Sequence, residues 1–297
     1  MWGGEGGGGG GGGGSSGSVS LFAATSERRR VCACVRVWLC GCFGAGMLPR
    51  GLKKLIKDTA PCKLVGRHHT AHFQTHDGRR LRGLTKRLEN NVFSKGLMPA
   101  IARSSALPAG GHWRGAGGGR RRGSAVDAQV SRLAGASAAA RSSARMLQLA
   151  RHVFATFSER GLEPVLGQRA VCAARLGIGT AADVICYNAA TKELVVVELK
   201  CGHSSGRTAV AIWDRKPLKM RGVLSACDDS TLHRHLAQLA CTRAMLLQEQ
   251  ETMARLADIG VAGVGGVLIY ANDANVAVYE LPKWWCEKAP LVLRALQ

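Results

Sequence analysis

The chain has 297 residues, and its 41 Lys and Arg outnumber its 20 Asp and Glu, which gives a net charge of +21 at pH 7. Nearly all of this excess lies in residues 1–150, which carry +18, whereas residues 151–297 carry +3. The apolar stretch over residues 31–48 is interrupted by Arg36 and several glycines, so no membrane span is expected.

Residues 1–140 are expected to form a long, basic and largely disordered tail ahead of a single folded domain over residues 141–297. The tail contains a glycine run at 3–14 and little periodic apolar patterning, so it buries too little surface to offset chain entropy. Its net charge and its basic runs at 79–82 and 120–122 favour binding to nucleic acid without sequence specificity.

The cysteines indicate a reducing compartment. Of the eleven in the chain, six lie within apolar segments of the second half, where free cysteine behaves as a small hydrophobic residue. We therefore expect an intracellular protein. The Arg-rich, acid-poor N-terminus is typical of a mitochondrial transit segment, and the basic runs are typical of nuclear import, so both locations stay open.

Apolar periodicity predicts seven elements in the second half of the chain. In chain order they are a helix, three strands, a helix and two strands, over residues 143–160, 165–174, 181–187, 193–201, 230–246, 264–270 and 275–281. Gly161 is a stop signal for the first helix, and Ser230 is a cap for the second.

The two strands within residues 181–201 carry acids where neither a core nor an ordinary surface requires them. If the hairpin folds symmetrically about the turn at 188–193, Asp183 lies opposite Glu198, with the Cβ atoms about 5 Å apart. Facing carboxylates repel each other, so the pair predicts a divalent cation. Oxygen ligands suit Mg²⁺ or Mn²⁺, and Lys200 points to the same side as Glu198.

Asp183, fourteen intervening residues and then Glu198-Leu199-Lys200 form a pattern that resembles the active site of the PD-(D/E)XK nuclease superfamily. The resemblance covers roughly residues 146–285, about half of the chain. It implies an α/β protein with a restriction-endonuclease-like fold, in which an αβββαβ core forms a mixed central sheet flanked by helices.

The segment 230–242 resembles the Gln-bearing helix of the RecB-like and lambda-exonuclease-like branches of that superfamily. Gln238 occupies the Gln position of their Q-x-x-x-Y motif, but Thr242 stands where those branches carry Tyr. This departure concerns the branch more than the superfamily.

The resemblance implies a metal-dependent DNA nuclease that hydrolyses phosphodiester bonds, as an exonuclease or an endonuclease. Asp183, Glu198 and the Leu199 carbonyl would hold one or two Mg²⁺ or Mn²⁺ ions. Lys200 would orient the attacking water, offset charge on the phosphate, or act as a base if burial lowers its pKa. Gln238 would hydrogen-bond the water or a phosphate.

Further residues are candidates for roles around this site. Glu163 and Gln168 are possible site-facing groups near the first strand. The basic residues expected to contact DNA are Arg175, Arg207, Lys216, Lys219 and Arg221.

Two alternatives stay open at this point. A nuclease-fold protein that has lost turnover would act as a nucleic-acid-binding module through its basic tail. Glu198 and Lys200 would also be explained by a solvent-facing ion pair at the end of an edge strand, which would contribute little to stability.

Overall fold

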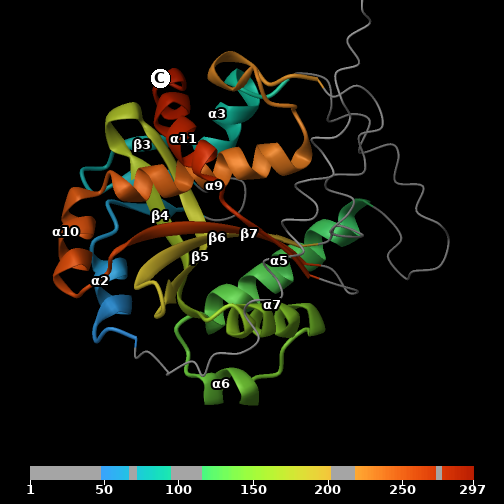
Figure 1. The fold of residues 1–297 in the computed structure, drawn as a ribbon, viewed down its shortest axis with the longest axis vertical. Coiled ribbons are helices and arrows are strands. Elements are labelled where there is room, and N and C mark those ends of the chain that lie inside the picture. The colour runs from blue at the N-terminus through green and yellow to red at the C-terminus, as the bar shows by residue number, and fades with distance from the viewer. Residues whose placement is uncertain (1–47, 67–71, 95–115, 202–217, 272–275) are drawn as a thin grey trace, which may run out of the picture. The chain divides into compact units, whose positions relative to one another are not determined.

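The computed structural model of the protein describes residues 48–66, 72–94, 116–201, 218–271 and 276–297. The fold is α/β, with a mixed sheet of eight strands flanked by helices (Figure 1). The strand order is β1-β2-β3-β5-β6-β7-β8, and β4 also pairs with β5. Among the helices of the described segments, none is long and apolar enough to cross a membrane.

The elements fall into two parts along the chain. The first part contains α2 (Leu52–Asp58), β1 (Cys62–Val65), β2 (His72–Thr75), β3 (Arg80–Gly83), α3 (Leu84–Asn91), α5 (Ala116–Leu133) and α6 (Ala138–Ser143). The second part contains α7 (Gln148–Glu159), β4 (Leu162–Ala173), η2 (Ala174–Leu176), β5 (Ile178–Asn188), β6 (Glu193–Cys201), η3 (Gly222–Leu224), α9 (Thr231–Leu247), α10 (Gln250–Asp258), β7 (Gly263–Ala271), β8 (Val276–Glu280) and α11 (Lys283–Ala295). The seven elements predicted for the second half are confirmed with shifted ends, whereas α10 and α11 were not predicted.

Strand β6 lies in the interior of the sheet, which explains its almost continuous apolar sequence. It pairs antiparallel with β5 and parallel with β7. Leu194 and Val196 pack into the core on the α9 side, while Val195 and Val197 pack against α5 and α7 on the other side (Figure 1). A strand buried on both faces carries apolar residues at successive positions rather than alternating ones.

Much of the segment predicted as a disordered tail is part of the folded sheet, so the boundary at residue 140 is wrong. Strand β3 pairs in parallel with β5. The helices α2, α3 and α5 contribute the buried side chains Leu52, Ile56, Leu84, Leu88, Val126 and Val130. The strands of this part have four residues each, too few for alternation to be recognised in sequence. Residues 1–47, with the glycine run, lie outside the described segments.

A buried arginine on β4, ion-paired within the second part, also links that part to α2 of the first part. The Arg169 guanidinium on β4 lies 2.6 Å from the Glu249 carboxylate, with side chains 1% and 5% exposed. Arg169 also donates from Nε to the Ile56 carbonyl of α2 at 2.9 Å. The pair is buried and bidentate. Removing either partner would strongly destabilise the fold, because the remaining charge would be left buried and unpaired.

Candidate active site

Strands β5 and β6 separate at one end, and the fork between them holds the predicted acids. The β5–β6 ladder ends at the pair Val184–Val197, so Asp183 and Glu198 are the next residues on the two strands. Beyond this point β6 stays paired with β7, whereas the same edge of β5 pairs with β3 only at its first two residues. Asp183 therefore lies where β5 exchanges one neighbouring strand for another.

Asp183 is held in the fork by a backbone amide. The amide of Leu199, which no longer faces a β5 carbonyl, donates to Asp183 Oδ2 at 2.8 Å. Gln168 of β4 lies opposite Asp183, between the paired residues Gly167–Val184 and Arg169–Ala182. The backbone of β6 thus fixes the carboxylate, and β4 places Gln168 across from it.

Gln168 reaches the site because the backbone of β4 is distorted there. The β4–β5 ladder runs from Gly167–Val184 directly to Arg169–Ala182 and omits Gln168. Gln168 has φ 51°, in the left-handed region that residues other than glycine rarely adopt. Such strain persists where the surroundings enforce it and is common at functional sites.

Helix α5 brings a third acid, Asp127, which the sequence interpretation missed. Gln168 Nε2 donates to Asp127 Oδ2 at 3.2 Å, while Asp127 Oδ1 is buried and has no hydrogen-bond partner among the described residues. The helix approaches closely because residue 167 is glycine, and a Cβ there would lie 2.4 Å from Ser131 Cα. A signal was present: Asp127 is the only acid between Glu89 and Glu159.

Glu198 lies on the face covered by α9, and its side chain is only 1% exposed. The Lys200 ammonium and the Gln238 amide, the latter at 2.8 Å, both donate to its Oε1. Neither bond uses Oε2. Because Glu198 is buried and β6 is an interior strand, the alternative of a solvent-facing ion pair on an edge strand is wrong.

The three acids have perturbed pKa values. Burial, reinforced by the charge of Asp183, raises the pKa of Glu198 to about 8 even though Lys200 opposes the shift. Burial likewise raises the pKa of Asp183. Burial and the Asp183 charge raise the pKa of Asp127 to about 6. One lysine therefore does not compensate three carboxylates.

Lys200 carries its proton in this environment. Burial acts to lower the pKa of Lys200, but the charges of Glu198 and Asp183 outweigh it and raise the pKa. Of the roles expected from the sequence, this favours an ammonium that offsets charge or orients water over a lysine that acts as a base.

A histidine–tyrosine pair lies beside Glu198 and was also not predicted. His235 Nδ1 on α9 lies 2.6 Å from the hydroxyl of Tyr270 on β7. Burial raises the pKa of Tyr270, with the charges of Tyr279 and Glu198 adding to the effect. Thr242, which stands at the Tyr position of the Q-x-x-x-Y pattern that residues 230–242 resemble, is buried and donates to the Gln238 carbonyl at 2.9 Å.

Other predicted residues lie elsewhere. Glu163 pairs with Arg141 at 3.0 Å, away from the fork, so its predicted site-facing position is wrong. The Arg221 guanidinium donates to the carbonyls of Phe93 at 2.6 Å and Asn90 at 2.7 Å, which fixes the end of α3. Arg221 is thus occupied within the fold and not available as a DNA contact.

The remaining basic candidates differ in their availability. Lys219 is exposed but forms an ion pair with Asp228 at 2.7 Å. Arg175, in η2, is exposed, and no ion pair or side-chain hydrogen bond involves it within the described part of the chain. Arg207 and Lys216 lie outside the described segments.

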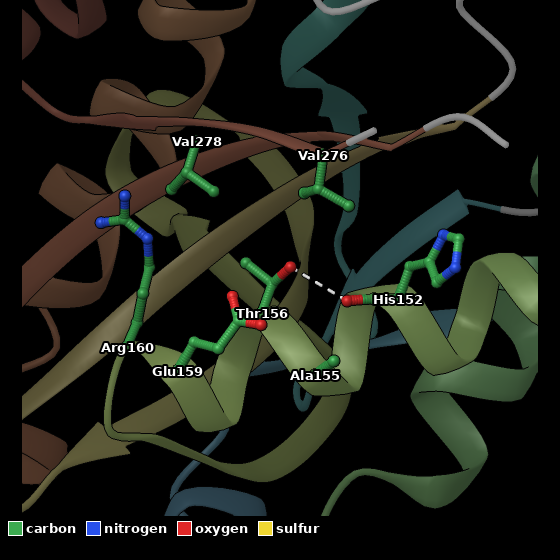
Figure 2. A pocket seen from close by; sticks show the side chains of 7 residues that line it. All are labelled: His152, Ala155, Thr156, Glu159, Arg160, Val276 and Val278. Carbon is green, nitrogen blue, oxygen red and sulfur yellow. Dashed lines mark hydrogen bonds between the residues drawn. The ribbon is translucent and has the colours of Figure 1, made fainter. Parts of the chain in front are cut away.

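A separate cavity of about 450 Å³ lies between α7 and β8 (Figure 2). Its lining consists of His152, Ala155, Thr156, Glu159, Arg160, Val276 and Val278. The Thr156 hydroxyl donates to the His152 carbonyl of the same helix at 2.9 Å. No residue of the carboxylate fork lines this cavity, so it is not part of the candidate site.

No protein-family model, curated protein or solved structure matches the chain. The functional assignment therefore depends on the chemistry of the fork.

Proposed function

We propose that the protein is a metal-dependent DNA nuclease of the PD-(D/E)XK type, with a restriction-endonuclease-like fold. One observation carries the proposal: the buried Glu198 and the partly buried Asp183 are the next residues beyond the last β5–β6 pair, where the two strands separate, and Lys200 is bound to Glu198. Desolvated acids with raised pKa values cost stability, so their arrangement favours a functional role over a structural one.

The fork suits Mg²⁺ or Mn²⁺. In the described part of the chain, no group of three or more His, Cys, Asp or Glu side chains forms a complete metal cage. Mg²⁺ does not require one, because it keeps several waters and commonly uses one or two carboxylates. Asp183, Glu198 and the Leu199 carbonyl would hold the ion, and the unpaired Asp127 Oδ1 marks an uncompensated polar atom close by. When bound, the ion supplies Lewis-acid polarisation of the phosphodiester.

The side chains of the fork divide the remaining tasks. The Lys200 ammonium stabilises negative charge that develops on the phosphate oxygens. Gln238 fixes Glu198 through Oε1, and no hydrogen bond within the described segments occupies Oε2. Asp127, with a pKa of about 6 and a free Oδ1, is suited to accept a proton from an attacking water near neutral pH.

DNA is the proposed partner because the protein is strongly basic. The net charge of +21 favours a polyanion, and Arg175 is an exposed contact candidate. Exonuclease and endonuclease activity are both compatible with this site.

The Lys200 role has a direct test. Lys200→Ala is expected to lower kcat by a factor of roughly 100 or more with little change in DNA affinity, because the ammonium acts on charge that develops in the transition state. Single-turnover cleavage and a separate binding titration in chelator measure the two effects. Lys54→Ala removes an ion-paired lysine that is 82% exposed on α2 and serves as the matched control. A loss confined to binding would make Lys200 a phosphate contact and contradict the assigned role.

The shifted pKa values predict an unusual pH dependence of stability. In metal-free buffer, folded Glu198 keeps its proton up to about pH 8, whereas the unfolded chain releases it near pH 4.5. The stability contribution is therefore present at low pH and is lost as the pH rises from about 5 to about 8.

Glu198→Gln is expected to flatten this profile and to raise Tm at pH 8 by roughly 5 °C or more. Added Mg²⁺ should stabilise the wild type most at high pH, where both acids are charged. Thermal unfolding across this pH range, with and without Mg²⁺, measures both effects. Identical profiles for wild type and variant would show that Glu198 is not the buried, protonated group inferred here.

A further inference from the structure

Two cysteines outside the carboxylate fork lie in one buried cluster. Cys62 begins β1 and Cys172 lies on β4, and among the described residues the cluster contains only Leu81 and Ala170 besides them as buried members. The side chains are free thiols, and the residues are 2% and 5% exposed. Strands β1 and β4 are in contact, and this contact brings the two thiols into the same cluster.

We propose that Cys62 and Cys172 are a redox modification site that forms a reversible disulfide on reaction with a peroxide. The Cys172 thiolate attacks one peroxide oxygen and the O–O bond breaks, which gives a sulfenic acid and a hydroxide; the hydroxide takes up the proton that the Cys172 thiol released and becomes one water. Cys62 then attacks the sulfenic sulfur, the S–S bond forms, and the hydroxyl leaves with the Cys62 proton as a second water. Two thiols are oxidised for each peroxide reduced.

The surroundings of the two thiols differ in the way this sequence of steps requires. The neighbouring Cys62 thiol lowers the pKa of Cys172, and the charges of Arg79 and Arg169 act in the same direction. The Cys172 thiol, together with burial, raises the pKa of Cys62. Thiolates are the reactive form of cysteine, so Cys172 attacks and Cys62 resolves.

The position of β1 gives the peroxide access. It is a four-residue strand at the end of the sheet, and among the described strands it pairs only with β2. Short terminal strands open locally at a lower free energy than global unfolding. By contrast, Cys186 and Cys241 are buried in the interior, and burial raises their pKa values.

The disulfide would join β1 to β4 across 109 intervening residues, four positions from Gln168 on the same strand. Closing a loop of this length restricts the unfolded chain and stabilises the fold. Oxidation would thus hold β1, and with it the first part of the chain, against β4.

The test uses the full chain, treated with hydrogen peroxide, alkylated and mapped by mass spectrometry. The expected result is a Cys62–Cys172 cross-linked peptide that dithiothreitol removes, with a rise in Tm of several degrees. Cys62→Ser and Cys172→Ser should abolish both, whereas Cys286→Ser, a matched control on α11, should retain them. Circular dichroism of the reduced variants, with Cys62→Ala as a second replacement, verifies folding.

Two results would overturn the proposal. One is oxidation of Cys172 to sulfinic acid without cross-linking. The other is formation of the cross-link with no change in Tm. Neither readout depends on DNA cleavage, so the outcome is separate from that of the proposed nuclease function.

Discussion

Replacing Asp183 by asparagine is expected to abolish DNA cleavage while leaving the fold intact. The substitution keeps the shape of the side chain and its bond from the Leu199 amide but removes the charge that would hold a cation. We expect the rate to fall by a factor of about 1,000 or more, because the loss acts on the reaction rather than on folding.

The same variant is expected to be more stable than the wild type in metal-free buffer. Burial is the main cause of the raised pKa of Glu198, and the charge of Asp183 adds to it, so the neutral amide would remove this second contribution. Cleavage and Tm should be measured beside Asp258→Asn, which removes an exposed acid from α10. Full activity in Asp183→Asn would exclude the carboxylate pair from the reaction.

Deletion of residues 1–140 is expected to abolish folding, whereas deletion of residues 1–45 should preserve it. Residues 46–297 form one compact unit, and the longer deletion removes α2, β1, β2, β3, α3 and α5 from it. The side chains lost include the buried Leu52, Ile56, Leu84, Leu88, Val126 and Val130, and burial of each contributes about 1.5–3 kcal/mol. Their sum is comparable to the whole stability of a typical domain, about 5–15 kcal/mol.

Circular dichroism and thermal unfolding of the two truncated proteins test this boundary. The longer deletion also removes the Ile56 carbonyl from buried Arg169 and the Asp127 side chain from the fork. A cooperative transition in residues 141–297 would contradict the assignment of the first part to the fold. Loss of the transition in residues 46–297 would mean that the folded unit extends further toward the N-terminus.

Local patterns predicted the second half of the fold well. The β-branched run of β6, the turn before it and the Ser230 cap of α9 are all decided by neighbouring residues. The register that brings Asp183 toward Glu198 follows from the length of the hairpin, because the turn fixes which residues face each other.

Features that depend on distant contacts were missed. Arginines and glycines obscure the amphipathic pattern of α5, which is stabilised by packing against β4 and β6. The left-handed backbone at Gln168 is enforced by β5 and by Asp127, which no local pattern reveals. The Arg221 side chain was expected to be free, but the carbonyls at the end of α3 come close to it only in the folded chain.

The most direct test of the nuclease assignment is a cleavage assay of the purified full-length protein. Labelled duplex and single-stranded DNA should be incubated with Mg²⁺ or Mn²⁺, with excess chelator, and with metal restored after chelation. The proposed function predicts hydrolysis that requires the cation and returns when it is restored. DNA binding without cleavage of either substrate under all metal conditions would contradict it and would favour a nuclease-fold protein that only binds nucleic acid.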